Sequence, residues 1–217
     1  MRRLTLSFDN GPCSDTTPTV LDELAARNLR AYFFVVGRQI LRPGGRQIVK
    51  AAAAAGHIIG NHSMNHSEPL GTSEDPDHVA EEIEATERLL IDAGVASKPP
   101  LFRPFGRGGQ IGHHLLSALA AQHLISNKYS LVLWNSVPRD WIHHRDWPDQ
   151  AIQDIKSHRH TVMVLHDLPT SAMIELPRFL DYVADNDVEV TLELPEDCLP
   201  IQEGVASGSL AACVAPS

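Results

Sequence analysis

The chain has 217 residues, of which 43% are hydrophobic and 21% charged, and this is the composition of a globular protein with a full core. The 18 Lys and Arg residues against 27 Asp and Glu give a net charge of −9, which argues against binding to a nucleic-acid backbone. No apolar stretch approaches the ~20 residues of a membrane span, so we expect no membrane partner.

Predicted strands and helices alternate along the chain. In order they cover residues 3–9 (strand), 17–28 (helix), 31–36 (strand), 47–55 (helix), 57–61 (strand), 77–93 (helix), 101–103 (strand), 129–135 (strand), 148–158 (helix), 161–166 (strand), 172–186 (helix) and 188–194 (strand). Several strands, such as AYFFVV and TVMVLH, are continuous apolar runs, which is typical of strands buried on both faces. Glycine follows the second and third helices as a C-terminal cap, and we expect the last helix to kink at Pro177.

These alternating segments indicate one α/β domain over residues 1–195. Seven strands separated by helices predict a parallel sheet, which is either doubly wound or closed into a barrel. Residues 196–217 contain Gly204, Gly208 and many small side chains, so we expect a C-terminal tail of low order.

Chemically active residue types collect after the predicted strands, at the edge where α/β folds bind their ligands. In strand order they are Asp9 and Asn10, the segment NHSMNH at 61–66, RPFG at 103–106, Asp140 and Trp141, and His166 and Asp167. His62 and His66 lie four residues apart, so on one helical turn both imidazoles would point the same way and could bind one metal ion.

Each of these signals has an ordinary explanation when it is taken alone. Asp9 and Asn10 are common turn residues, and with 12 histidines in the chain an HxxxH pair can arise by chance. A lone arginine, tryptophan or histidine is more often a surface ion pair or a core residue. Together, however, the residues supply the ligands, base, orienting group and general acid that a metal-activated water requires.

The segments SFDNGP, HSMNH, RPFG, WNSVPRDW and VLHD, in this order, resemble the five motifs of the polysaccharide deacetylase family, also called the NodB-homology or family-4 carbohydrate esterases. The similarity covers about residues 3–194. It implies the family fold, an α/β distorted (β/α)7 barrel. It also implies a hydrolase of carbon–nitrogen, non-peptide bonds that removes acetyl groups from N-acetylated sugars with a divalent metal, commonly zinc, with cobalt or nickel as alternatives.

The resemblance also implies the roles of the acid–base residues. Asp9 would be the general base that takes a proton from the metal-bound water, and His166 the general acid that protonates the leaving amine. Arg103 would hold Asp9 ionised and oriented, and Asp140 would favour the protonated form of His166. Because Arg-Asp-Trp occurs at both 139–141 and 145–147, we favour the first copy, which directly follows WNSVP.

The remaining roles concern the metal and the substrate. The resemblance makes His62 and His66 metal ligands. Trp141 and Leu165 would wall a small pocket for the acetyl methyl group, and the backbone N–H of Phe105 would stabilise the tetrahedral oxyanion.

Position 10 departs from the family pattern, which usually has a second acid there as a metal ligand. Here it is Asn10, whose amide oxygen can coordinate a metal but brings no negative charge. We therefore expect the site to hold its metal more weakly.

Two other functions remain open. The chain could hydrolyse a small linear or cyclic non-sugar amide, or it could be a catalytically silent barrel that only binds a ligand, with Asn10 as the lesion. Retention of Asp9 and His166 argues against the silent barrel, because a binding module needs neither an acid nor a base.

The expected compartment is the cytoplasm. Met1-Arg2-Arg3 leads directly into a strand rather than an apolar signal segment, and three unclustered cysteines indicate no disulfide framework. A soluble chito-oligosaccharide would be accessible there, whereas wall polymers lie outside. The sequence gives no prediction of the oligomeric state.

Overall fold

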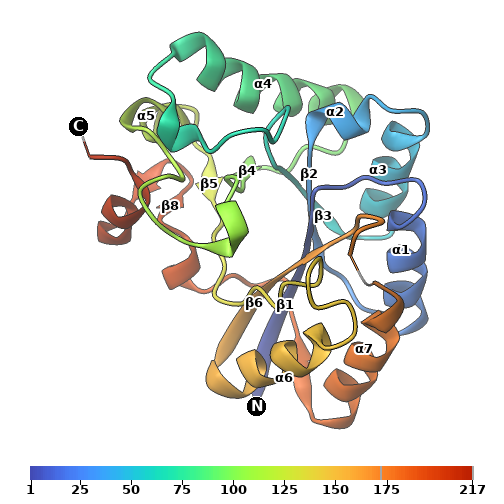
Figure 1. The fold of residues 1–217 in the computed structure, drawn as a ribbon. Coiled ribbons are helices and arrows are strands. Elements are labelled where there is room, and N and C mark those ends of the chain that lie inside the picture. The colour runs from blue at the N-terminus through green and yellow to red at the C-terminus, as the bar shows by residue number, and fades with distance from the viewer. Residues whose placement is uncertain (172, 217) are drawn as a thin grey trace.

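The computed structural model describes residues 1–171 and 173–216 and shows a curled sheet with helices around it (Figure 1). The strands are β1 Arg2–Asp9, β2 Tyr32–Val35, β3 Ile58–Asn61, β4 Leu101–Phe102, β5 Ser130–Leu131, β6 His160–His166, β7 Val188–Val190, β8 Ile201–Gln202 and β9 Val205–Ala206. The α-helices are α1 Thr17–Ala26, α2 Gly37–Ile40, α3 Gly45–Ala54, α4 Pro76–Ala93, α5 Ala118–Ser126, α6 Trp147–Ser157 and α7 Leu176–Asp185. Short 3-10 turns are η1 Leu70–Thr72, η2 Arg107–Gly109, η3 Met173–Glu175, η4 Glu196–Cys198 and η5 Gly208–Cys213.

The sheet is parallel over most of its width. Its strand order is β6-β1-β2-β3-β4-β5-β8-β9, and β7 pairs with the first residues of β1. Neighbours from β6 to β5 run parallel, whereas β8 and β9 are antiparallel to their neighbours. Parallel strands that share one direction place all their carboxyl ends at one edge, and this edge carries the candidate site.

The alternation of side chains along β1 separates the core from the site. Leu4, Leu6 and Phe8 are fully buried among residues of α1, α6 and α7. Because successive strand residues point to opposite faces, the buried polar residues Ser7 and Asp9 face the inside of the curl. An acid at the last position of β1 is therefore directed toward the interior of the sheet and not toward the helices.

The curled sheet closes between β5 and β6 through a few backbone hydrogen bonds and not through regular strand pairing. Beyond β5 the chain runs on to Asn135 and Ser136, whose backbone N–H groups both donate to Val162 O at 3.2 Å. Ser136 O in turn accepts from Val164 N at 2.9 Å, and Ser136 pairs with Met163 as an isolated parallel bridge. This arrangement confirms the expected α/β fold with a distorted barrel.

Several element boundaries differ from the sequence prediction. Pro177 does not kink the last helix. Helix α7 begins at Leu176, so the proline lies in the first turn, where a backbone N–H has no partner within the helix and its absence costs no hydrogen bond. The predicted start at residue 172 lies outside the described residues. The strands expected at 129–135 and 188–194 are the shorter β5 and β7. Helices α2 and α5 were not predicted, although Ser117 caps α5 by accepting from Ala120 N.

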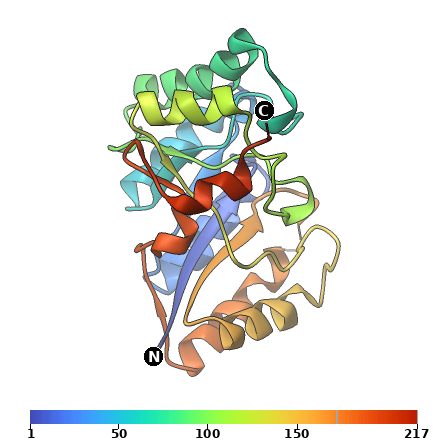
Figure 2. The ribbon, with the colours of Figure 1, turned by 90° about the vertical axis from the view of Figure 1, so that its left-hand side faces the viewer.

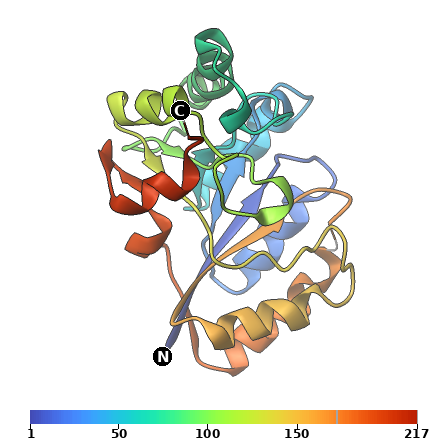
Figure 3. The ribbon, with the colours of Figure 1, turned by 60° about the vertical axis from the view of Figure 1, so that its left-hand side comes forward.

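The C-terminal segment is packed and not a tail of low order. Ile201 of β8 pairs with Leu131 of β5, and Val214 bridges to Leu116. Cys198, Ile201 and Cys213 are at most 2% exposed, so a few apolar side chains among small residues hold the segment. Figure 2 and Figure 3 show it in red against the edge of the sheet. Within the described residues, no helix is long and apolar enough to cross a membrane.

Candidate active site

A pocket of about 290 Å³ lies at the carboxyl ends of the parallel strands. Of the predicted site residues, those that line it are Asp9, Asn10, His62, His66, Phe105, Trp141 and His166. Arg103 and Asp140 are fully buried and contact two of these side chains from behind. The structure thus brings together nine of the ten predicted residues, and Leu165 is the exception.

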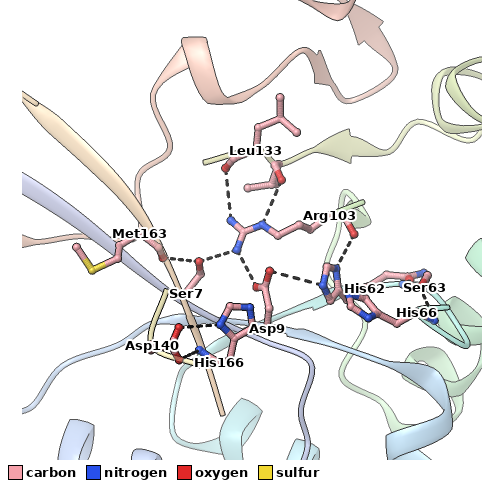
Figure 4. A network of polar contacts seen from close by, with 12 residues as sticks. Ser7, Asp9, His62, Ser63, His66, Arg103, Leu133, Asp140, Met163 and His166 are labelled. Atoms are coloured by element: carbon pink, nitrogen blue, oxygen red, sulfur yellow. Dashed lines mark hydrogen bonds and ion pairs between the residues drawn. The ribbon is translucent and has the colours of Figure 1, made fainter. Parts of the chain in front are cut away.

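Asp9, the last residue of β1, is 3% exposed and is paired with a buried cation (Figure 4). Arg103 Nη1 donates to Asp9 Oδ1 at 2.9 Å and to Ser7 Oγ at 2.6 Å. The other oxygen, Asp9 Oδ2, lies 3.6 Å from His62 Nε2. One carboxylate oxygen is therefore neutralised by the guanidinium, and the other can accept a proton on the pocket side.

Arg103 follows β4 and is held on all sides. Its Nε donates to Val132 O at 3.2 Å and its Nη2 to Leu133 O at 3.4 Å. The guanidinium carbon lies 3.9 Å from the centre of the Phe34 ring, a cation–π contact. A planar guanidinium with this many fixed acceptors cannot turn away from Asp9, so the orientation of the carboxylate is set by the fold.

His62 and His66 come together in a loop and not in the helical turn that we expected. Ser63 has φ +67° and His66 has φ +50°, and residues 62–67 are not helical. The two imidazole centroids are nevertheless 4.6 Å apart, and the His66 ring also packs 4.2 Å from the ring of Phe105. The prediction of a shared face was right for the wrong reason, because left-handed residues rather than helical periodicity juxtapose the rings.

Both imidazoles have a nitrogen available for a ligand. His62 Nδ1 lies 2.8 Å from Arg103 O, and because a carbonyl only accepts, Nδ1 carries the hydrogen and Nε2 the lone pair. Burial lowers the pKa of both His62 and His66 to about 3, so both rings are neutral at physiological pH. Neutral imidazole is the form that coordinates metals.

Asn10 directly follows β1 with φ +76°, a left-handed conformation that asparagine tolerates well. Its backbone N–H donates to Phe34 O at 3.2 Å, which fixes the turn. Asn10 lines the pocket. Its side-chain Oδ1 is buried and has no hydrogen-bond partner within the described residues. A buried acceptor without a partner is uncommon in proteins and indicates that something else binds there.

His166 ends β6 and is held by a buried carboxylate. Asp140 Oδ2 accepts from the backbone N–H of His166 at 2.9 Å, and Oδ1 lies 2.8 Å from Nδ1. Burial alone lowers the pKa of His166, but the hydrogen bond and charge of Asp140, together with the charges of Asp9 and Asp167, outweigh it, so the pKa is raised. The centroids of the Trp141 and His166 rings lie 4.7 Å apart in an edge-to-face arrangement. Since Nδ1 is occupied, Nε2 is the atom that can serve the pocket.

The first Arg-Asp-Trp copy is the one at the pocket. Asp140 and Trp141 contact His166, whereas Asp146 and Trp147 lie at the start of α6, where Trp147 is fully buried in the core.

The prediction for Leu165 is wrong. Leu165 is fully buried, but it pairs with Phe8 and belongs to the same core cluster, on the helix side of the sheet. Its neighbour Val164 lines the pocket instead. The period of two along β6 could have shown this, because residues 164 and 166 share a face and residue 165 does not.

The motifs left Trp134 without a role, yet it lines the pocket. Its Nε1 donates to Gly109 O at 2.9 Å, which ties the glycine-rich loop after β4 to the segment that follows β5. A Cβ on Gly106 would lie 2.3 Å from the Trp134 ring, so only glycine fits there. The available signal was the position of Trp134 at the start of WNSVPRDW.

A curled parallel sheet with ionisable side chains gathered at the carboxyl ends of its strands defines a barrel-like α/β protein with an enzyme-type pocket. The chain belongs to the polysaccharide deacetylase family, whose sequence model matches residues 1–122. This confirms the resemblance seen in the five motifs.

A curated relative agrees with this family, and solved structures agree with its fold. A peptidoglycan-N-acetylglucosamine deacetylase of Bacillus cereus is 30% identical over 171 residues, which is 76% of this chain and 72% of the relative. A family 4 carbohydrate esterase from Streptomyces lividans, in complex with acetate, has a TM-score of 0.74 at 24% identity and covers 93% of this chain and 97% of its own. A family 4 acetyl xylan esterase from Clostridium thermocellum, with a cobalt ion, has a TM-score of 0.69 at 24% identity, with coverages of 88% and 87%.

Other relatives are much longer than this chain. The peptidoglycan-N-acetylglucosamine deacetylase PgdA of Listeria monocytogenes is 37% identical over 91 residues, or 42% of this chain, but the chain spans only 19% of its length.

Proposed function

We propose that this protein is a metal-dependent deacetylase that hydrolyses the N-acetyl groups of amino sugars in an oligo- or polysaccharide. The observation that carries the proposal is a pair of opposite acid–base groups in one pocket: Asp9 held by Arg103, and His166 held by Asp140. Two of the relatives are named for deacetylation of N-acetylglucosamine in peptidoglycan, which supports this sugar as the substrate unit. The esterase from S. lividans binds acetate, the acid that such a reaction releases.

We propose Asn10, His62 and His66 as the metal ligands, with zinc as the metal and cobalt or nickel as alternatives. The unpartnered Oδ1 of Asn10 and the free Nε2 of His62 fit such a role. Within the described residues no group of three His, Cys, Asp or Glu could hold a metal, so an amide oxygen is needed to complete three protein ligands. The C. thermocellum esterase holds cobalt, which supports a divalent ion. When bound, the metal would activate water and polarise the amide carbonyl.

The residues of the chain then have separate tasks. Asp9 accepts the proton of the attacking water on Oδ2, because Oδ1 is engaged by Arg103. His166 donates a proton from Nε2 to the leaving nitrogen, because Nδ1 is engaged by Asp140. The backbone N–H of Phe105, which has no acceptor among the described residues, stabilises the oxyanion. Trp134, Trp141 and Val164 surround the acetyl methyl group.

The test is acetate release from defined substrates. Zinc-loaded protein is incubated with chito-oligosaccharides and with soluble peptidoglycan fragments, and acetate and free amine are measured together. We expect equal amounts of both products, and loss of both in the His62→Ala, His66→Ala protein. Hydrolysis of a small cyclic or linear amide in place of these substrates would redirect the proposal to a non-sugar amide. Saturable ligand binding with no turnover at any zinc concentration would indicate a silent barrel.

A further inference from the structure

Both side-chain and backbone hydrogen bonds hold the loop that carries the two histidines. It is not helical, and Ser63 and His66 are left-handed. Inside the loop, Asn61 Oδ1 accepts from Ser63 N at 2.9 Å and Ser63 Oγ accepts from His66 N at 3.2 Å. These two bonds fix the beginning of the loop and the backbone of His66. Helix α2 also holds the loop, because Gly37 N donates to Ser63 O at 3.0 Å and Arg38 N to Met64 O at 2.9 Å.

Asn65, the next residue of the loop, is attached to helix α4 through Glu82. The carboxylate accepts two hydrogen bonds from Asn65, from the backbone N–H to Oε2 at 3.0 Å and from Nδ2 to Oε1 at 2.7 Å. Asn65 directly precedes His66. A second bond from the same helix supports the start of the loop, because Asn61 Nδ2 donates to Ile83 O at 2.8 Å.

A buried carboxylate is an unusual choice for simple packing. Glu82 is 2% exposed, and the other buried positions of α4 are Val79, Ile83, Thr86, Leu90 and Ala93. Among the described residues, no Lys, Arg or His forms an ion pair with Glu82, so the two N–H donors of Asn65 are its compensation. Burying a charge is costly, and an apolar residue would fill the space without that cost.

We propose that Glu82 is a positioning residue that, through Asn65, fixes the place of the His66 imidazole in the pocket. The proposal rests on the metal site proposed above. Groups that orient metal ligands from outside the coordination sphere typically change metal affinity by roughly 10–100-fold when they are removed. This role depends on where the two carboxylate oxygens lie and not on their negative charge, since each oxygen accepts a directed hydrogen bond from Asn65.

The experiment is a competitive chelator titration with zinc alone as the probe, on folded protein without substrate. Glu82→Ala should weaken zinc binding by roughly 10–100-fold. Glu82→Gln should stay within about threefold, because the amide oxygen still accepts from the backbone and the Asn65 amide can turn to accept from the glutamine N–H. The exposed Glu81→Ala on the same helix is the matched control and should leave zinc affinity unchanged.

Two further variants keep the test decisive. If Glu82→Ala does not fold, Asn65→Ala removes one of the two bonds and should still weaken zinc binding several-fold. In a His66→Ala background, Glu82→Ala should cause no additional loss, because the residue acts through His66.

The outcomes separate this proposal from the one on which it rests. If His66→Ala leaves zinc affinity unchanged, the metal site itself is wrong, and the positioning role falls with it. If His66→Ala weakens binding but neither Glu82→Ala nor Asn65→Ala does, only the positioning role is overturned. Equal losses in Glu82→Ala and Glu82→Gln would also overturn it, because they would show an effect of charge.

Discussion

The pocket has two halves that differ in how the protein balances charge. The acid–base half consists of Asp9 with Arg103 and of His166 with Asp140, and each of its two functional groups touches a fully buried partner of opposite charge. The donor half consists of Asn10, His62 and His66. Its two imidazoles are neutral because burial lowers their pKa to about 3, and its third member is an uncharged amide.

The two halves therefore differ in how far they are prepared before a ligand binds. In the acid–base half the orientation of each group is set by the fold before anything binds. The donor half offers electron pairs but no compensating negative charge, and the nearest carboxylate, Asp9, is already paired with Arg103. We therefore expect this chain to bind its metal weakly, whereas the proposed proton-transfer groups, Asp9 and His166, are each held by a buried partner.

The largest expected effect separates the two halves. Asp9→Asn and His166→Ala should each lower kcat by roughly 10²–10⁴-fold, the usual worth of a general base or acid. Zinc affinity should change far less, since neither residue belongs to the donor half. Initial rates of acetate release at saturating zinc and a chelator titration measure the two quantities.

The exposed Asp15→Asn is the control for a lost carboxylate in the same segment of the chain. A loss of only a few-fold in Asp9→Asn or His166→Ala would contradict the assigned roles. A parallel collapse of zinc affinity in these variants would contradict the separation of the two halves.

Sequence reasoning reached the acid–base half more securely than the donor half. Asp9 and His166 end parallel strands that pair directly at these two residues, so the rule that strand ends share one edge was sufficient. Arg103 follows β4 at the same edge. Leu165 shows the limit of this rule, because a motif places a residue at an edge and only the alternation along the strand decides its face.

The donor half could not be derived by local periodicity. The helical spacing of His62 and His66 suggested the right pair of residues, but the rings meet in a loop that is left-handed at Ser63 and His66 and in which Asn65 is bonded to Glu82. Glu82 is distant in sequence, and nothing in the motifs linked it to the loop. Similarly, the packing of residues 196–216 against β5 depends on long-range contacts that composition does not show.

A smaller effect is expected when Asp140, the partner of His166, is replaced. Asp140 raises the pKa of His166 against the lowering effect of burial, so Asp140→Asn should lower that pKa. The general acid must be protonated to act, and its activity is lost as pH rises through its pKa. The alkaline limb of the pH–rate profile should therefore move to lower pH, with a smaller loss at its optimum than in His166→Ala. An unchanged alkaline limb would show that another group supplies the proton.

The smallest expected effect concerns Asn10, where one substitution gives the donor half the negative charge that it lacks. Asn10→Asp adds a carboxylate to two neutral imidazoles, and ligand charge is a main determinant of metal affinity. We expect zinc binding to tighten by roughly tenfold, which corresponds to about 1.4 kcal/mol. Aspartate tolerates the left-handed backbone of Asn10 almost as well as asparagine does, so the fold should be retained. Asn28→Asp, at another left-handed asparagine away from the pocket, is the matched control.

The increase in zinc affinity should depend on pH, because the new carboxylate lies next to Asp9 and the Arg103 guanidinium already pairs with Asp9. Two adjacent carboxylates raise each other's pKa, so at low pH a proton would occupy the new ligand instead of the metal. Tightening should therefore be clear above about pH 6 and fade below it, which chelator titrations at two pH values can measure. Equal zinc affinities of parent and variant at both values would show that Asn10 does not face the metal. Tighter binding with unchanged turnover at saturating zinc would show instead that negative charge can be added to the donor half without disturbing the proton-transfer groups beside it.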